Sequence, residues 1–414
     1  MGEIEEIIAL LIAAAVATVT ARWVRLSYTL ALLLLGLGLG AAAVPAPVLS
    51  ADVILLLFLP PLLFEAAFAL DLGRLWSVRL GVLALALPGV LLAMAVGGSL
   101  VHWGLGLPWT TALLFGAMIA ATDPVAVLVT FRQLGVDKRL AVLIEGESLL
   151  NDGVALVLLV TLVDAVDGGF HLGSAAGTFL VAVTGGTVIG LALGWLGHRL
   201  IARSDEHLTE MTVSVAIAYA AFLAAEQLHF SGVLATVVAA MTLGRLGRVR
   251  GWAYSGGSEA LLIDLWAFFA FAANAALFLL MGLTVRTTGL LEHPDDVLLG
   301  IAAALGGRAA VAYLFGPLLG RLGVPVTGAE RHVLFWGGLR GAVALAAALS
   351  LPPDFAHRGQ ILAMTYGTVL FTLLAQGLTI APLVRRLGLL DGLPQPSPTG
   401  ANERSGTTAA MLPK

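Results

Sequence analysis

Residues 145–160 carry the strongest indication of how this chain folds. They read Glu145-Gly146-Glu147-Ser148-Leu149-Leu150-Asn151-Asp152-Gly153 and continue into the apolar segment 154–160. On a helix, Ser148 and Asp152 are i,i+4 neighbours, and Glu147 and Asn151 form a second such pair on the adjoining face. Acidic side chains leading into a long apolar helix predict a polar site inside a membrane. The alternative, a polar helix start at the membrane interface, suits Glu145 best and Asp152 least.

The composition of the whole chain supports a membrane protein. Of its 414 residues, 59% are hydrophobic and 12% are charged, and the mean hydropathy is +0.97. An ordinary soluble domain is about 45–50% apolar and about 25% charged. These values exclude a soluble enzyme, a disordered protein and a nucleic-acid binder. The chain has no cysteine, which excludes disulfides and thiolate metal sites.

Thirteen apolar runs are long enough to be transmembrane helices, which need about 20 residues each. The first six lie at about 4–21, 27–44, 52–70, 78–102, 110–131 and 139–163, and the next four at about 174–202, 208–227, 230–247 and 260–286. The last three lie at about 295–319, 328–350 and 358–386. The acidic start of the chain differs from a secretory signal, so the first run is predicted to be retained.

The distribution of basic residues predicts the orientation. With the N-terminus outside, 18 of the 22 Lys and Arg residues fall on the inner side, and Arg286 and Arg358 fall on the outer side. Arg308 and Arg340 lie within spans. This asymmetry follows the positive-inside rule and predicts a cytoplasmic C-terminus. The segment 391–414, rich in Pro, Ser, Thr and Gly, is predicted to be a disordered cytoplasmic tail.

Seven charged residues fall within or at the edges of the predicted spans. They are Glu65, Asp123, Glu145, Glu147, Asp152, Arg308 and Arg340. Each isolated charge costs about 2.5–3.5 kcal/mol at the centre of a helix. These side chains must therefore face a polar cavity or one another. We expect Arg308 to be the counter-charge of Glu147, and Glu65 could instead be a buried glutamate with a structural partner.

Two spans contain predicted breaks. Thr122-Asp123-Pro124 interrupts the fifth span, because proline removes a backbone donor and disfavours helix in the residue before it. Three glycines around Arg340 mark the twelfth span. A capped kink and a packing site with a snorkelling arginine are the structural alternatives. The breaks occupy matching places in halves of opposite direction, an arrangement that points to a transporter site at the membrane midplane.

Several carboxylates, a hydroxyl and freed backbone carbonyls would form an all-oxygen site, which suits hard cations. The G-x-S-x-G and H-E-x-x-H signatures are absent. A buried carboxylate such as Asp152 can hold either a proton or a cation. If the site opens alternately to each side, it exchanges the two, which predicts cation/proton antiport without enzyme chemistry.

At these motifs the sequence resembles the monovalent cation:proton antiporters, specifically the sodium/proton exchanger branch with NhaP-like prokaryotic members. The motifs are Phe64-Glu65-Ala66, Thr122-Asp123-Pro124, Glu147 to Asp152 and Gly338 to Ala342. The resemblance implies an all-α fold of about thirteen transmembrane helices in two inverted repeats. It also implies a homodimer in the cytoplasmic membrane of a prokaryote, no cofactor, and a role in pH homeostasis.

The resemblance implies a membrane transporter domain at 1–390, made of two parts and a linker. A dimerisation part (about 1–70 and 204–290) and a core part (about 75–165 and 295–390) would be joined by a linker helix at about 174–202. Asp152 would carry the cation or proton, and the ion shell would add Asp123, Ser148, the Thr122 backbone carbonyl and Glu65. Supporting roles would fall to Asn151, Glu147, Arg308, Arg340 and Pro124.

In the family that the sequence resembles, an Asn-Asp pair such as Asn151-Asp152 goes with electroneutral exchange, because one Na⁺ or one H⁺ neutralises one carboxylate. The expected substrates are Na⁺ or Li⁺ with H⁺, and K⁺/H⁺ exchange is the close alternative. A proton-pumping subunit of a redox complex is disfavoured because no lysine lies within a predicted span. An ion channel would need a continuous pore, and an intramembrane hydrolase would need a nucleophile and base that the sequence does not offer.

Overall fold

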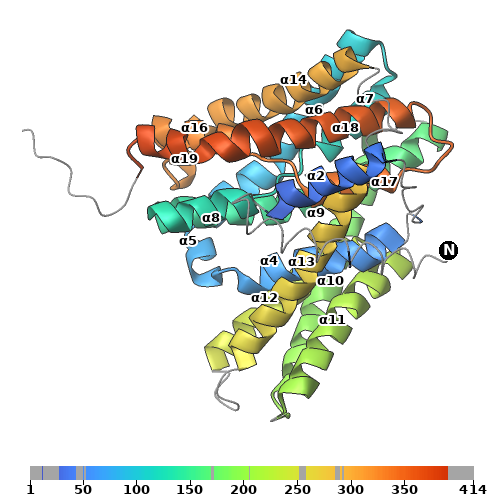
Figure 1. Ribbon diagram of the computed structural model, residues 1–414. Helices are drawn as coiled ribbons and strands as arrows, with labels where there is room; N and C mark the ends of the chain where they lie inside the picture. Colours follow the sequence, from blue (N-terminus) through green and yellow to red (C-terminus); the bar gives the residue numbers. More distant parts are fainter. Residues whose placement is uncertain are drawn as a thin grey trace, which may run out of the picture.

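The computed structural model shows an all-helical protein (Figure 1). It describes residues 12, 28–42, 50, 53–168, 172–204, 206–250, 258–284, 290 and 293–389. Nearly all of the predicted span at 4–21 and the predicted tail at 391–414 lie outside these residues.

The helices with described bounds begin at the second predicted span. Its helices up to the middle of the chain are α2 (Tyr28–Ala41), η1 (Ile54–Phe58), α4 (Leu59–Ala69), α5 (Leu72–Ala86), α6 (Pro88–Leu105), α7 (Trp109–Met118), α8 (Val125–Leu134), α9 (Lys138–Gly168) and α10 (Leu172–Ile201). The later helices are α11 (His207–Gln227), α12 (Gly232–Arg250), α13 (Ser258–Thr284), α14 (Pro294–Ala310), η3 (Val311–Phe315), α15 (Gly316–Leu319), η4 (Gly320–Leu322), α16 (Gly328–Trp336), α17 (Ala342–Leu349), α18 (Arg358–Phe371), η5 (Thr372–Gln376) and α19 (Gly377–Arg386).

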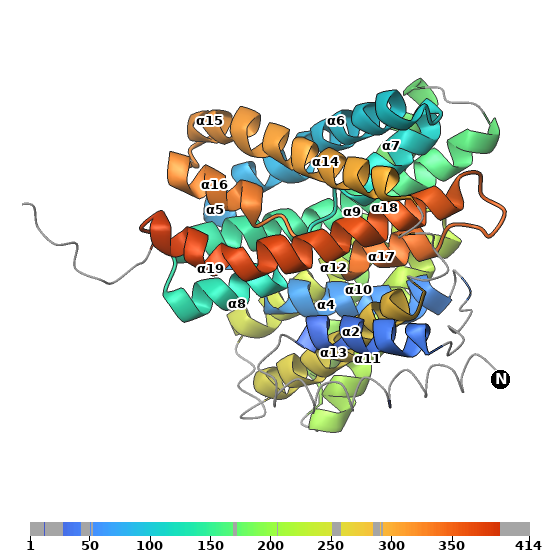
Figure 2. The same ribbon diagram turned by 45° about the horizontal axis from the view of Figure 1, so that its top comes forward.

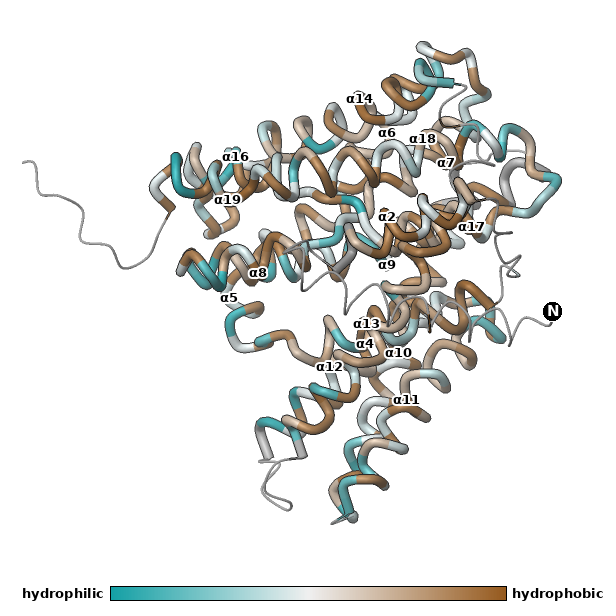
Figure 3. Tube along the Cα trace, in the orientation of Figure 1, coloured by the Kyte–Doolittle hydropathy of each residue, from teal (hydrophilic) through white to brown (hydrophobic). Residues whose placement is uncertain are grey.

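Seven helical stretches in the described residues are long and apolar enough to cross a membrane. They are Leu72–Leu105, Lys138–Val163, Ala176–Ile201, His207–Gln227, Glu259–Thr284, Pro294–Leu322 and Arg358–Arg386. Four shorter apolar helices accompany them. Figure 3 shows apolar residues along most of the tubes and hydrophilic residues gathered at many helix ends, as expected for helices in a bilayer.

Helix ends follow local sequence signals. The Oδ1 of Asp71 accepts a hydrogen bond from the backbone N–H of Arg74 at 3.1 Å and caps α5, so this helix begins at Leu72, earlier than the predicted span at about 78. This backbone hydrogen bond holds the pKa of the Asp71 carboxyl below its usual value. Pro88 occupies the first turn of α6, where its missing N–H costs nothing.

The helices pack in two groups, which Figures 1 and 2 both show. In one group, α2 packs on α13, and α4 packs on α12 and α13. In the other, α6 packs on α7 and α14, α14 on α18, and α5 on α9. Helix α10 packs mainly on α11 and α12, and α9 contacts helices of both groups. The close approach of α2 and α13 needs glycines, because a Cβ on Gly36 would lie 2.9 Å from the Cα of Gly282.

Two short non-helical segments lie side by side inside the second group. Residues 119–124 separate α7 from α8, and residues 337–341 separate α16 from α17. The backbone N–H of Asp123 donates to the carbonyl of Leu339 at 2.8 Å. We refer to these two segments together as the crossing.

Candidate functional site

Helix α9 holds one segment of the crossing through a buried polar network. The hydroxyls of Thr122 and Ser148 lie 2.9 Å apart, and the Asn151 Nδ2 donates to the Thr122 hydroxyl at 2.8 Å. The Asn151 Oδ1 accepts from the backbone N–H of Thr122 at 3.3 Å. All three side chains are buried. The structure thus brings together three predicted site residues and fixes residues 119–124 against α9.

Asp123 follows this network directly. Its Oδ1 accepts a hydrogen bond from the backbone N–H of Val125 at 3.0 Å, so the carboxylate caps the start of α8. Gly341 of the second segment lies so close that a Cβ built on it would be 2.7 Å from the Asp123 carboxyl carbon. The crossing therefore leaves no space for a side chain opposite this carboxylate.

Asp123 and Asp152 are more open than the residues around them. Both are half-buried, whereas Ser148 and Asn151 expose 2% and 1% of their surface. Asp152 lies within electrostatic range of Asp123 and of Arg340. Two half-buried carboxylates within electrostatic range of one another offer oxygen ligands of the kind that bind small hard cations.

The N-termini of α8 and α17 meet at the crossing, and so do the C-termini of α7 and α16. A helix N-terminus carries a partial positive charge and a C-terminus a partial negative charge. The first pair favours the carboxylates, and the second favours Arg340. Broken backbone of this kind is tolerated at membrane depth only where it is buried in protein or lines a cavity.

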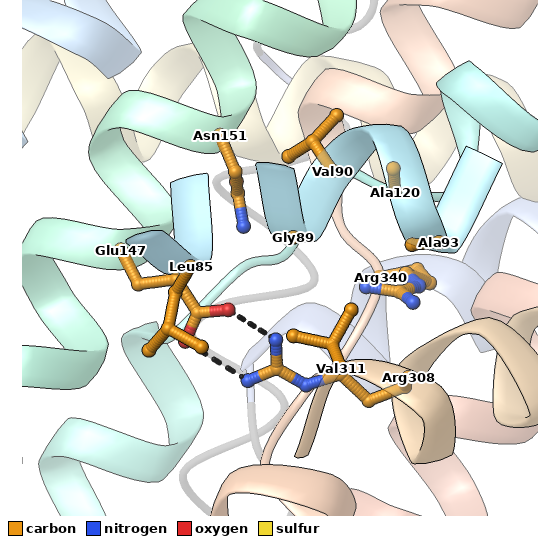
Figure 4. Close-up of a pocket in the computed structure, with 10 residues that line it drawn as sticks. All are labelled: Leu85, Gly89, Val90, Ala93, Ala120, Glu147, Asn151, Arg308, Val311 and Arg340. Carbon is orange, nitrogen blue, oxygen red and sulfur yellow. Dashed lines mark hydrogen bonds and ion pairs between the residues drawn. The ribbon is translucent and has the colours of Figure 1, made fainter. Parts of the chain in front are cut away.

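Glu147 and Arg308 form a buried ion pair. The Arg308 Nη2 donates to the Glu147 Oε2 at 3.1 Å, and the Arg308 Nη1 donates to the Glu147 Oε1. The Arg308 Nε donates to the carbonyl of Leu334 at 2.8 Å, so each of the three guanidinium nitrogens donates a hydrogen bond. Figure 4 shows this pair lining one pocket together with Asn151 and Arg340. The pair links α9, α14 and α16.

Arg340 is bound mainly by the crossing itself. Its Nη1 donates to the carbonyl of Ala121 at 3.1 Å, and its backbone N–H donates to the Thr372 hydroxyl at 3.1 Å. Only 2% of the residue is exposed. The guanidinium therefore spans from the second segment of the crossing to the first, at the end of α7.

Glu65 reaches the site region from α4. It is half-buried and lies within electrostatic range of Asp123 and Arg132. The preceding Phe64 stacks on Trp266 of α13 with ring centroids 4.1 Å apart. This aromatic contact fixes the part of α4 that carries Glu65. Glu145 is half-buried near Glu65 and Arg132, outside the hydrogen-bonded network.

Some groups of the site were not identified from the sequence. The carbonyls of Ala121 and Leu339 act through the backbone, which leaves no mark on side-chain chemistry. Thr372 had a detectable signal, because it is one of several polar residues at helical spacing within the apolar last span. The predicted role of the Thr122 carbonyl stays a prediction.

Comparison with known proteins identifies the family of the chain. The sodium/hydrogen exchanger transmembrane family matches residues 7–386. The Na⁺/H⁺ antiporter NhaH of Halobacillus dabanensis is 36% identical over 342 residues, covering 81% of this chain and 83% of that protein. The Na⁺/H⁺ antiporter NhaP of Pseudomonas aeruginosa is 37% identical over 354 residues, covering 81% of each chain.

A solved structure shows the same fold. The sodium proton antiporter MjNhaP1 of Methanocaldococcus jannaschii at pH 8 superposes with a TM-score of 0.76 at 20% identity, covering 93% of this chain and 98% of that one. The predicted all-helical antiporter fold is thereby confirmed. Taken with the match over residues 7–386, these findings place the chain in the transmembrane sodium/hydrogen exchanger family.

Proposed function

We propose that this protein is a secondary active Na⁺(Li⁺)/H⁺ antiporter of the cytoplasmic membrane and not an enzyme. The observation that carries the proposal is the pair of reachable carboxylates, Asp123 and Asp152, beside two adjoining breaks in helical structure. The relatives NhaH and NhaP are named Na⁺/H⁺ antiporters. A cation and a proton would compete for Asp152 and be exchanged by alternating access.

The proposed ion shell consists of Asp152, Asp123, the Ser148 hydroxyl and the Thr122 backbone carbonyl, with Glu65 approaching from α4. Oxygen ligands of this kind suit Na⁺ and Li⁺, and K⁺ is the alternative substrate. Asn151 would hold the Thr122 segment, as its two hydrogen bonds to Thr122 suggest.

The remaining supporting roles go to four residues. Glu147 and Arg308 would brace the core, Arg340 would hold the crossing, and Pro124 would keep the first break open. Because residue 151 is an uncharged asparagine, only the charge of Asp152 changes during a cycle. We therefore propose electroneutral exchange of one cation for one proton.

We propose that the chain forms thirteen transmembrane spans in two inverted halves, with α7–α8 and α16–α17 as the broken fifth and twelfth spans. The core part (about 75–165 and 295–390) would move against a dimerisation part (about 1–70 and 204–290). Helix α10 would be the linker between them. The two packing groups of helices are consistent with this division. A homodimer would keep the dimerisation parts fixed while each core moves.

We also propose that the N-terminus is outside and the C-terminus cytoplasmic. The Arg139 Nη1 donates to the carbonyl of Pro325 at 2.7 Å, which brings two predicted inner loops together. On the predicted outer side, the Gln360 Nε2 donates to the Asp296 Oδ2 at 3.2 Å. These contacts agree with the predicted grouping of loops onto two sides, and the distribution of basic residues assigns the cytoplasmic side.

The test is cation-driven proton movement in liposomes. Protein is reconstituted into vesicles with an acid interior, a pH-sensitive dye and a clamped membrane potential, and Na⁺, Li⁺ or K⁺ is added outside. We expect Na⁺ and Li⁺ to collapse the gradient with wild-type protein. Asp152→Asn should abolish the response, because an amide cannot exchange a proton for a cation at neutral pH.

The control is Asp295→Asn, which removes an exposed carboxylate at the start of α14. It should transport like wild type. A wild-type protein that answers none of the three cations between pH 6 and 9 would refute the proposed exchange. A response to K⁺ alone would move the assignment to K⁺/H⁺ exchange.

A further inference from the structure

Helix α18 and the π-helical turn η5 carry a buried polar stripe. Its members are Thr365, Thr368, Thr372 and Gln376. Spacings of three and four residues place them on one face of the helical rod that Figure 2 shows crossing the molecule. Each exposes 1% of its surface or less. We refer to these four residues as the α18 stripe.

Most of the stripe lacks hydrogen-bond partners. Within the described part of the chain, Thr365 Oγ1, Thr368 Oγ1 and Gln376 Oε1 are buried and unpaired. This is unusual even for this protein, because the Thr161 and Thr236 hydroxyls donate to the carbonyl four residues earlier. Buried polar groups almost always have a partner, and where protein supplies none, an ordered water often does.

The stripe passes the crossing at Thr372. That hydroxyl accepts from the Arg340 backbone N–H at 3.1 Å and donates to the carbonyl of Val369 at 3.0 Å. The Arg340 Nε is buried and unpaired among the described residues as well. Arg340 therefore meets the stripe at Thr372 through its backbone, and the unpaired acceptor of Gln376 lies one helical turn beyond Thr372.

We propose that the α18 stripe is an internal water site whose molecules bridge Thr365, Thr368 and Gln376 to the Arg340 Nε–H. Water is the ligand that matches, because it can accept from the guanidinium and donate to the amide oxygen at the same time. A cation could not accept from Nε–H and would face the arginine charge. The bound water would hold Arg340 in place at the crossing, so the stripe residues are positioning residues.

The first test detects the water directly by X-ray hydroxyl-radical footprinting of the detergent-solubilised full chain. Met364 flanks Thr365 and is fully buried, and Met281 is equally buried in another helix, α13. We expect Met364 to be oxidised at least threefold faster than Met281, because radicals form from bound water. The double variant Thr365→Val, Thr368→Val should remove the difference. Equal, slow oxidation of both methionines in wild type would overturn the proposal.

The second test asks whether Thr368→Val raises or lowers Tm. If the stripe is dry, Thr368→Val removes an unpaired hydroxyl and leaves Tm unchanged or raised. If water is bound, Val lowers Tm and Thr368→Ser restores it. Thr236→Val, at an equally buried but paired threonine, is the control for the substitution itself. A Tm for Thr368→Val at or above that of wild type would contradict the water site.

Exchange in liposomes separates this proposal from the proposed function. A bridged Arg340 predicts that Thr368→Val slows cation-driven proton movement several-fold and that Thr368→Ser does not. If wild-type protein showed no exchange, the antiporter function would be refuted. Footprinting and Tm would still decide whether the water site exists. Wild-type exchange rates in Thr368→Val would refute the positioning role.

Discussion

The buried pair of Glu147 and Arg308 is the strongest electrostatic contact at the scale of single residues. Three guanidinium nitrogens are satisfied by one carboxylate and one backbone carbonyl. Removing one member would leave the other charge buried without a partner. The breaking of such pairs costs about 3–5 kcal/mol, whereas replacing both members can be nearly neutral.

We therefore predict that Glu147→Gln lowers the free energy of unfolding by about 3–5 kcal/mol. The double variant Glu147→Leu, Arg308→Met should recover much of that loss. Thermal unfolding in detergent measures both. The control is Asp71→Asn, which breaks an exposed ion pair with Arg74 that should contribute about 0–1 kcal/mol. Equal stability of Glu147→Gln and wild type would show that the pair does not brace the core.

At the scale of elements, the crossing depends on Gly341, a position with no space for a larger side chain. Residues 337–341 pass residues 119–124 at backbone hydrogen-bond distance, and Gly341 lies against the Asp123 carboxylate. A methyl group there must push Asp123 away. A misplacement of about 1 Å can reduce activity about a hundredfold in a site that depends on geometry.

Gly341→Ala should accordingly raise the apparent KM for Na⁺ at least tenfold in the liposome assay, with the protein still folded by its thermal transition. Gly320→Ala is the matched control, because a Cβ at that position meets nothing within 4 Å. If Gly341→Ala transports with wild-type affinity, the crossing does not set the geometry of the ion site.

The helical class and the pairing of Glu147 with Arg308 could be predicted from the sequence, whereas most of the other contacts among the candidate residues could not. A charge within an apolar run is energetically costly and needs a polar partner, so Asp123, Asp152, Glu147 and Arg308 stood out as candidate site residues. Contacts made by backbone groups are not visible in this way. The bond from Asp123 to the Leu339 carbonyl, and the two partners of Arg340, needed the three-dimensional structure.

At the scale of the whole molecule, the two groups of helices are joined by hydrogen bonds between described residues. One is the contact between the Thr284 hydroxyl of α13 and the Tyr366 hydroxyl of α18, at 3.1 Å. The proposed motion of core against dimerisation part would break such contacts. Contacts inside the core, such as Asp296 with Gln360, would move as a unit.

Cross-linking tests this motion. The chain has no native cysteine, so only introduced cysteines react with the reagent. We predict that Thr284→Cys with Tyr366→Cys, joined by a short bis-methanethiosulfonate reagent that forms a disulfide with each thiol, loses most exchange and regains it on reduction. The pair Asp296→Cys with Gln360→Cys, joined in the same way, should keep exchange. Full transport by the first cross-linked pair would rule out movement between the two groups at this contact.

The central claim is that one carboxylate site binds either a cation or a proton. Proton release on cation binding tests it most directly. Na⁺ is added to purified protein in weakly buffered solution, and the pH change is recorded for wild type and Asp152→Asn. The account predicts release of one proton per bound Na⁺ in wild type and none in Asp152→Asn. Release should fade as the starting pH rises and the site loses its proton, and saturation should need more Na⁺ as the pH falls. Binding of Na⁺ to wild type without proton release at every pH from 6 to 9 would contradict it.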